Sequence, residues 1–298
     1  MNPFFRKSTF LWNVPNVANG DPHAIADLLY QAKFESVMIK AADGPQIFVP
    51  NRTLFPNWGE NLKMELVQAL HDRGILVIGW GFNYGLNVIG EASVAISQVK
   101  RFGLDGWVFD AESRFDAQPG AESLAGRLAM TVKNALPSTP IGACGWSFYF
   151  NPSKPTIQWH PPAVMRAFMT YCDVGIPMQY WAGKGAAAAE FAVRNSLPQW
   201  RQITNKPIIP AGRAYTGDGG TVDSAGVQAF AAELIRQGCQ GYTWWSLEHG
   251  VRIPEVWAAL GASPQMNAPR PVVSIAEWAQ QVDQYLVRQG YTGPKPTA

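Results

Sequence analysis

Residues 105–112 have the sequence Asp-Gly-Trp-Val-Phe-Asp-Ala-Glu, a short aromatic and β-branched run that ends in two acidic side chains. Residues of these kinds favour strands. The run follows an apolar-periodic segment that ends at Gly103, and glycine is the usual residue at the positive φ that closes a helix. A helix followed at once by an apolar strand is the repeating unit of a parallel sheet.

The same unit recurs along the whole chain. Eight such runs alternate with helical patterns, and the predicted strands are residues 9–14, 36–41, 76–82, 106–112, 140–147, 174–181, 207–214 and 241–247. The G-x-G-x-x-G motif of a dinucleotide-binding fold is absent after the first strand. Eight units close a barrel more naturally than they extend an open sheet, and 298 residues are enough for one. The sequence therefore predicts a (β/α)8 barrel.

Composition narrows the classes of partner. Hydrophobic residues make up 47% of the chain and charged residues 15%, which suits a large buried core. The net charge is +2 with scattered basic residues, so we expect no nucleic-acid partner. No apolar run approaches the roughly 18 residues of a membrane span. The three cysteines and four histidines show no ligand spacing, so we expect neither a metal nor a cofactor, and no disulfide framework.

The two ends of the chain carry separate expectations. Residues 1–14 contain no apolar run before a small-residue cleavage site. We therefore expect no signal peptide and synthesis in the cytoplasm, with lysis or carriage on a particle as routes to an outside substrate. Residues 1–262 form the predicted barrel, and 263–298 form a proline-rich connector and one more helix. Ser274 and Glu277 have the spacing of a capping box. We expect the apolar stripe of this helix to pack on the barrel's outer ring; binding a protein partner is the alternative.

Polar and aromatic side chains gather where the predicted strands end. In a barrel these ends and the loops after them build the site. Aromatic faces suit sugar rings, and carboxylates suit sugar hydroxyls. The candidate site residues, which we expect to bind or act on a glycan, are Lys40, Trp80, Asp110, Glu112, Trp146, Tyr180, Trp181, Arg213, Trp244, Trp245 and Glu248. For a single tryptophan, burial in the core is the alternative; Lys40 could pair with an acid, and Glu248 could cap a loop.

Asp110 and Glu112 carry the strongest functional signal. They are two residues apart on one strand, so both side chains point to the same side of the sheet. If that side is the barrel interior, two acids lie together where burying unpaired charge is costly. Such pairs are useful when separated pKa values serve acid and base work. We therefore expect a catalytic role for Glu112, with Asp110 assisting.

Three segments together resemble the family-18 chitinases and their relatives. Residues 105–112 are similar to that family's fourth-strand D-G-x-D-x-D-x-E signature. Residues 178–180, Met-Gln-Tyr, resemble its sixth-strand M-x-Y, and residues 241–247 resemble its eighth-strand segment ending in Trp-Ser-Leu. The resemblance implies a substrate-assisted glycoside hydrolase acting on a β-linked N-acetylhexosamine polymer such as chitin or peptidoglycan.

The resemblance also implies a role for each matched residue. Glu112 matches the general acid, and Asp110 the carboxylate that orients the substrate's N-acetyl group. Tyr180 matches a hydroxyl donor to that group, and Trp245 the floor under the sugar being cleaved. No nucleophilic side chain is then required. The sequence departs from the pattern at Val108 and Trp181, where the family has aspartates, and at residues 79–81, Gly-Trp-Gly, where it has a Ser-x-Gly-Gly turn.

Three alternatives stay open at this point. The D-x-E pattern also resembles the family-25 muramidases, but their first-strand aspartate would fall near Asn13. A catalytically silent barrel that binds glycans, or is part of a larger assembly, is compatible with the departures at Val108 and Trp181, because fold alone does not fix function. Phosphosugar chemistry would need a glycine-rich anion site after the last strands, where Asp218 would repel a phosphate.

Overall fold

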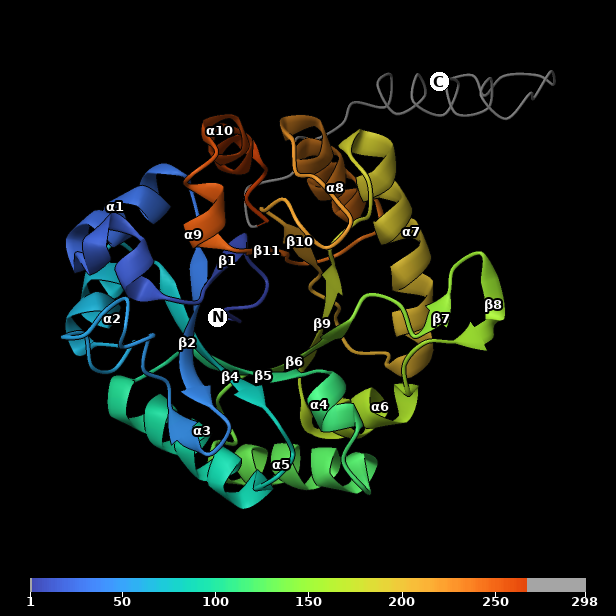
Figure 1. The fold of residues 1–298 in the computed structure, drawn as a ribbon, viewed down its shortest axis with the longest axis horizontal. Helices are drawn as coiled ribbons and strands as arrows, with labels where there is room; N and C mark the ends of the chain where they lie inside the picture. The colour runs from blue at the N-terminus through green and yellow to red at the C-terminus, as the bar shows by residue number, and fades with distance from the viewer. Residues whose placement is uncertain (1, 267–298) are drawn as a thin grey trace. The chain divides into compact units, whose positions relative to one another are not determined.

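The computed structural model describes residues 2–266, and within them eight parallel strands form a ring (Figure 1). Neighbouring strands pair in sequence order, and each pairing is parallel. The predicted (β/α)8 barrel is confirmed. The strands of the ring are β1 (Ser8–Leu11), β2 (Ser36–Asp43), β4 (Leu76–Asn83), β5 (Gly106–Ala111), β6 (Ile141–Trp146), β9 (Val174–Gln179), β10 (Ala211–Arg213) and β11 (Thr243–Trp245).

A helix follows each strand and covers the outside of the ring (Figure 1). Polar residues at three helix starts explain where those helices begin. Asp21, Asn87 and Asp223 each accept a hydrogen bond from a backbone N–H of the first turn. The eight covering helices are α1 (Pro22–Gln31), α2 (Met64–His71), α3 (Val88–Phe102), α5 (Ala121–Ala135), α6 (Pro162–Tyr171), α7 (Gly185–Ile203), α8 (Ser224–Arg236) and α10 (Pro254–Ala262).

The strand repeat of two divides the core into an inner and an outer cluster. On β5, Val108 lies in the inner cluster, which fills the barrel, while Trp107 and Phe109 lie in the outer cluster, against the helices. The same alternation places Trp245 with the inner cluster and Trp244 in the outer one. Position within a strand therefore decides which side chains can reach the interior.

The ring closes between the first and last strands. The backbone N–H of Ser8 donates to the carbonyl of Tyr242, and that of Tyr242 donates to the carbonyl of Arg6. Beside this seam the fully buried Lys7 ammonium donates to the carbonyls of Ala32, Gly261 and Ser263. Lys7 thus ties the end of the barrel's last helix to the end of α1.

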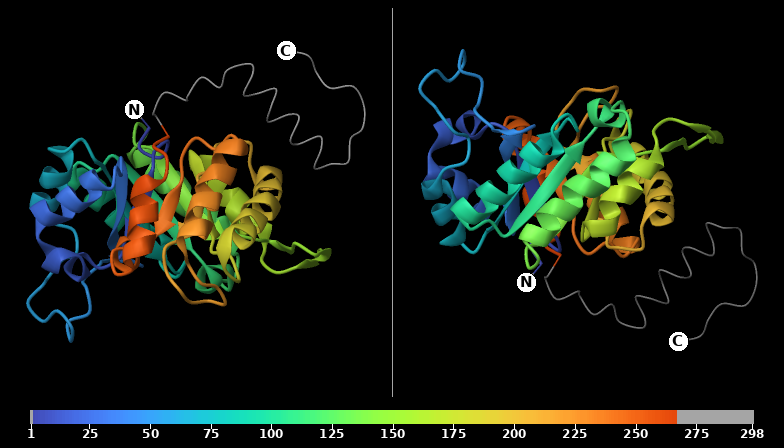
Figure 2. Two further views of the ribbon diagram at one scale, coloured as in Figure 1. Left: turned by 90° about the horizontal axis from the view of Figure 1, so that it is seen from above. Right: turned by 90° about the horizontal axis from the view of Figure 1, so that it is seen from below.

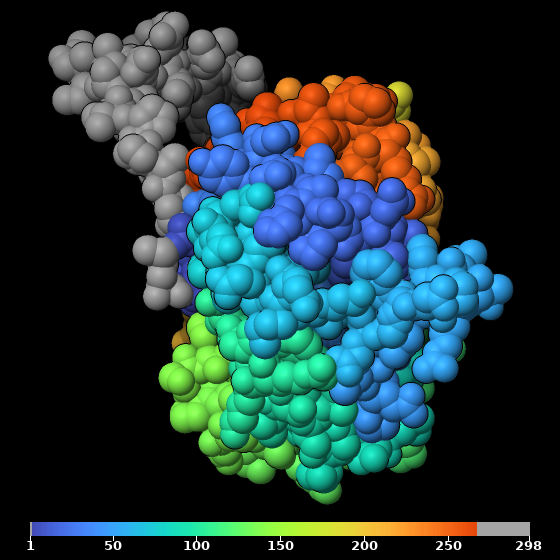
Figure 3. Space-filling model, turned by 90° about the vertical axis from the view of Figure 1, so that its left-hand side faces the viewer, coloured from blue at the N-terminus to red at the C-terminus, as the bar shows by residue number. Residues whose placement is uncertain are grey.

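Several elements were not expected from the sequence. The 43–60 segment contains β3 (Gln46–Ile47), which pairs with β2, and then protrudes from the barrel (Figures 2 and 3). A hairpin of β7 (Phe150–Asn151) and β8 (Lys154–Gln158) projects beside α7 (Figure 1). The seventh strand is shorter than predicted because Pro207 and Pro210 have no N–H for the ladder. Short helices also occur: η1 (Val14–Asn16), η2 (Ala18–Gly20), α4 (Ser113–Asp116) and α9 (Leu247–Gly250).

Residues 2–266 lie in one compact unit. The helix expected around residues 274–289 lies outside the described residues. The two expectations for it, packing on the barrel or binding a protein partner, therefore stay predictions. Among helices that the structure describes, none is long and apolar enough to cross a membrane.

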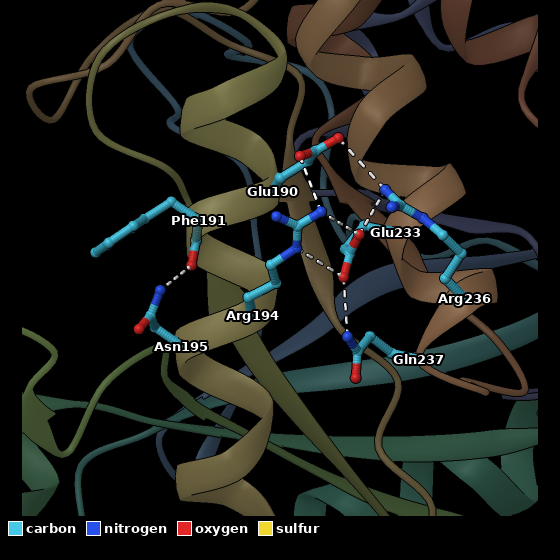
Figure 4. Close-up of polar contacts among 7 residues, drawn as sticks. All are labelled: Glu190, Phe191, Arg194, Asn195, Glu233, Arg236 and Gln237. Atoms are coloured by element: carbon cyan, nitrogen blue, oxygen red, sulfur yellow. Dashed lines mark hydrogen bonds and ion pairs between the residues drawn. The ribbon is translucent and has the colours of Figure 1, made fainter. Parts of the chain in front are cut away.

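Charged side chains join α7 to α8 on the outer surface (Figure 4). The Glu233 carboxylate is 2% exposed and accepts hydrogen bonds from Arg194, at 3.2 Å from both Nε and Nη2, and from Gln237 at 2.9 Å. Glu190 bridges Arg194 and Arg236 at 3.1 and 3.3 Å. Burial by itself would raise the pKa of Glu233, but these donors and the nearby arginines outweigh it and lower the pKa.

Glu233→Gln should therefore destabilise the fold in a pH-dependent way. Because the pKa of Glu233 is lowered on folding, its contribution is complete above its unfolded pKa of about 4.3 and is lost as pH falls through the folded value. We expect a loss of about 1–2 kcal/mol near neutral pH, since the arginine partners are half exposed. Urea unfolding at several pH values measures it, with the exposed Glu65→Gln as control. A loss that persists unchanged in acid would contradict the ionic origin.

Truncation after Met266 should leave the barrel folded. The last described residues are tied to the barrel, since the Tyr242 hydroxyl donates to the carbonyl of Pro264 and the Met266 N–H donates to Glu35 at 3.3 Å. A cut after Ala262 removes these contacts and the Ser263 acceptor of Lys7, so this shorter chain should be clearly less stable. Circular dichroism melts of the two truncations make the comparison. Unfolding of the 1–266 chain would show that later residues belong to the core.

Candidate active site

A cavity of about 550 Å³ opens at the carboxyl ends of the strands. This volume is in the range of small-molecule sites. Its lining combines acids with aromatic rings: Phe10, Asp110, Glu112, Cys144, Trp146, Ser147, Phe148, Trp159, His160, Met178, Tyr180, Tyr215, Asp218, Trp245 and His249.

Asp110 and Glu112 both line this cavity. Asp110 follows Val108 on the inward side of β5 and is 7% exposed, and Glu112 comes directly after the strand, where α4 begins. Burial, then the Glu112 charge, raises the pKa of Asp110 well above its usual value, against an opposing effect of Lys40. Among the described residues, Asp110 Oδ1 has no hydrogen-bond partner. This oxygen is buried without a partner, while the residue itself lines the cavity.

Glu112 is flanked by two further acids. Burial raises its pKa, and the charges of Asp116 on α4 and Asp218 in the loop after β10 raise it further, while Lys40 lowers it. Each flanking acid is held by an aromatic side chain. The Trp146 indole N–H donates to Asp116 at 2.8 Å, and the Tyr215 hydroxyl donates to Asp218 at 2.5 Å. Glu112 therefore keeps its proton to a higher pH than an ordinary glutamate does.

Trp245 provides an aromatic surface in the cavity and rests on two inner rings. Its centroid lies 5.4 Å from Phe10 and 5.6 Å from Trp80, and Phe10 and Trp80 meet edge to face at 5.7 Å. Trp80 is 1% exposed and does not line the cavity, so it supports Trp245 from below. Trp12, 40% exposed, lies 6.1 Å from Trp245 at the rim. Packing of this kind fixes the Trp245 ring in place.

Tyr180 lies in the wall of the same cavity. Its ring meets Tyr215 edge to face at 5.7 Å. Burial, with nearby Cys144 and Asp110, raises the pKa of Tyr180 well above its usual value. The hydroxyl therefore stays protonated and can act as a hydrogen-bond donor.

Lys40 lies next to the acids without lining the cavity. Its ammonium is 3.2 Å from Asp43 and stands over several ring faces, the nearest being Phe48 at 4.3 Å and Trp80 at 5.1 Å. Burial lowers its pKa, and Asp43, Asp110 and Glu112 oppose that effect. Lys40 is thus a buried counter-charge to the acids, rather than a side chain exposed to a ligand.

Four other candidates from the sequence lie outside the cavity. Trp244 and Trp181 point outward, where each packs against Phe230 at 5.1 and 5.6 Å. For Trp244 the cause is strand alternation, which turns it away when Trp245 turns inward. Both fill the layer between the ring and α8, so the expectation that they contact a glycan is corrected.

Glu248 and Arg213 are buried and bind the backbone instead of the cavity. The Glu248 carboxylate accepts the N–H groups of Trp12 and Asn13 at 2.7 and 3.1 Å, which fixes the turn after β1. Arg213 Nη1 donates to the carbonyls of Gly217 and Gly220 at 2.6 and 2.9 Å. Both side chains shape loops at the cavity rim, and neither is placed to contact a ligand there.

The β7–β8 hairpin brings residues to the cavity that the sequence did not indicate. His160 follows the hairpin and stacks on Trp146, with centroids 3.9 Å apart and planes 10° apart. Trp159 is 49% exposed and meets Phe148 edge to face at 6.3 Å. Their positions depend on hairpin pairing and not on a barrel strand end. The high tryptophan content was the one signal that could have pointed to them.

The described part of the chain holds no group of three acidic, histidine or cysteine side chains that could bind a metal ion.

Comparisons with known proteins show similarity of structure but not of sequence. No protein-family model matches the chain, and no curated protein matches it. A chitinase from Rhizomucor miehei superimposes with a TM-score of 0.57 at 13% identity, over 86% of this chain and 99% of that one. The Bacillus cereus spore cortex-lytic enzyme SleL gives 0.59 at 12% identity, over 86% and 74%.

A plant class V chitinase from Cycas revoluta, solved with (GlcNAc)3, gives a TM-score of 0.63 at 9% identity, over 86% of this chain and 99% of that one. At such identities the likeness concerns the fold. The chain has the (β/α)8 barrel fold of the family-18 chitinase-like group.

Proposed function

We propose that this protein is a glycoside hydrolase that cleaves a β-linked N-acetylhexosamine polymer, with Glu112 as general acid. The observation that carries the proposal is the pair of acids at the end of β5, Asp110 and Glu112, in the lining of an aromatic cavity. The class of enzyme named for the structural neighbours supports the proposal, since two are chitinases and one is a cortex-lytic enzyme.

Glu112 has the environment that a general acid needs. A carboxylic acid that donates a proton near neutral pH must have a raised pKa, and burial with two flanking acids supplies this. Its proton would go to the glycosidic oxygen as the bond from that oxygen to the anomeric carbon breaks. The resulting carboxylate would then take a proton from the attacking water.

Asp110 and Tyr180 suit an acetamido group. The Asp110 carboxylate, which lines the cavity, can bind the acetamido N–H, and the Tyr180 hydroxyl can donate to the acetamido oxygen. That oxygen would attack the anomeric carbon as the leaving sugar departs, giving a cyclic oxazolinium that water opens. The reaction needs no nucleophilic side chain, which is a recognised exception among glycoside hydrolases.

A catalytically silent glycan-binding barrel is the second candidate, and two observations favour it. Val108, the inward residue before Asp110 on β5, is apolar and fully buried. Trp181, next to Tyr180, faces α8. The two carboxylates that the resemblance would place near Asp110 are therefore absent. A silent barrel would keep the cavity and its aromatic wall but would not turn over a glycan.

Glu112→Gln should abolish hydrolysis and leave glycan binding nearly unchanged. Glutamine keeps the size of glutamate but has no acidic proton, and general acid catalysis contributes about 10²–10⁴-fold. Turnover is measured by mass spectrometry of new ends from N-acetylglucosamine oligomers and purified peptidoglycan, and binding by calorimetry.

The control for this experiment is Glu122→Gln, an exposed residue in the first turn of α5. Retention of wild-type turnover by Glu112→Gln would remove Glu112 from the mechanism. Binding without any wild-type turnover would favour the silent barrel.

Trp244 and Trp245 are neighbours in sequence but face opposite sides of β11, so they form a matched pair. Trp245→Phe should weaken oligomer binding with little loss of stability, because a smaller ring covers less of a sugar. Trp244→Phe should leave binding intact and lower stability by about 1–3 kcal/mol, because it leaves a void between the ring and α8. Calorimetry and urea unfolding of both variants test this. Equal effects of the two changes on binding would contradict the assignment.

A further inference from the structure

The loop after β10 contains a two-residue reverse turn whose tip is Asp218. Gly217 and Gly220 exchange backbone hydrogen bonds at 3.0 and 2.9 Å, and Asp218 and Gly219 between them have φ of 46° and 74°. Positive φ at both central residues is the pattern of the tight turn that Asp-Gly favours. Asp218 therefore has a local reason to occupy this position in the turn.

The turn is anchored at its base to the barrel. The fully buried Arg213 donates to the carbonyls of both Gly217 and Gly220. The loop after β9 adds two backbone bonds, from the Gly183 N–H to Gly219 at 3.0 Å and from the Thr221 N–H to Gly183 at 2.8 Å. This explains why a buried arginine at the end of β10 does not line the cavity. Arg213 instead holds the turn whose Asp218 lines the cavity.

The Asp218 side chain is held as well. The Tyr215 hydroxyl donates to its carboxylate at 2.5 Å, and the Tyr215 ring lies 4.7 Å from the Arg213 guanidinium carbon. Both Tyr215 and Asp218 line the cavity with Glu112. The carboxylate is thus fixed at the rim on the side of β10, while Asp116 approaches Glu112 from α4.

We propose that Asp218 is a positioning residue of the site, whose fixed negative charge keeps the proton on Glu112 until the leaving oxygen takes it. The inference rests on the proposed function. A like charge nearby disfavours ionisation of a carboxylic acid. Asp218 is exposed, so solvent and salt weaken its effect.

Other groups also act on Glu112 from the surrounding elements, and Asp218 has to be separated from them. The acids are Asp110 on β5 and Asp116 on α4, and the cation is Lys40 on β2. The remaining titratable side chains of the cavity are Cys144, His160, Tyr180, Tyr215 and His249. Asp218 is the acid of this set that can lose its charge with the least disturbance, because Asn-Gly forms the same turn.

The test is Asp218→Asn in the full chain, with Asp72→Asn as matched control. Asp72 is exposed at the end of α2, the opposite end of that helix from the cavity rim. The first readout is a carbon-13 NMR titration of the Glu112 carboxyl, assigned by its loss in Glu112→Gln. We expect Glu112 to titrate at lower pH in Asp218→Asn and unchanged in Asp72→Asn. The difference should shrink in about 1 M salt, where charges are screened beyond about 3 Å.

The second readout is the pH profile of kcat/KM on an N-acetylglucosamine tetramer. We expect the alkaline limb of Asp218→Asn to move to lower pH, with a several-fold loss near pH 8 and little change near about pH 5. An equal loss at every pH would show a merely structural role, and an unshifted Glu112 resonance would overturn the proposal. Absence of wild-type turnover would contradict only the proposed hydrolase function. The NMR titration would still test the effect of Asp218 on Glu112.

Discussion

The closed ring of eight strands allows only every second side chain of each strand to face its interior, and the rest of the structure depends on this constraint. Most of the inner positions are apolar and fill the barrel from Phe4 up to Trp80. At the carboxyl end of β5 the same inward side carries Asp110, with Glu112 directly after the strand. The acids therefore lie over an apolar core that cannot solvate them, and their raised pKa values follow from that position.

The acids at the mouth outnumber the cations near them. Lys40, which is itself bonded to Asp43, acts on Asp110 and Glu112. Together with burial, this balance raises the pKa values of Asp110 and Glu112. Such a balance suits an acid that gives up a proton, and it costs stability that the surrounding aromatic packing has to offset.

Buried side chains that bond to loop backbone hold the loops around these acids. Arg213 holds the turn below Asp218, and Glu248 holds the turn after β1. Helix α7 likewise anchors the base of the β7–β8 hairpin, since Gln199 accepts the N–H groups of Tyr149 and Phe150 at 2.9 Å. Hydrogen bonds from these buried side chains to the backbone restrain the loops. The cavity therefore has a defined shape although loops build most of its wall.

The sequence by itself determined the eight strands, their order, and the pairing of Asp110 with Glu112, because each depends on local spacing and on the strand repeat of two. Strand ends alone could not separate Trp244 from Trp245, or show that Arg213 and Glu248 turn toward backbone. Those outcomes depend on which face of a strand meets a helix and on loop partners far along the chain. The positions of Asp218 and His160 in the cavity lining were decided only by tertiary structure. A turn and a hairpin bring them to the cavity that Glu112 lines, from segments about 100 and 50 residues away, and no local pattern encodes such an approach.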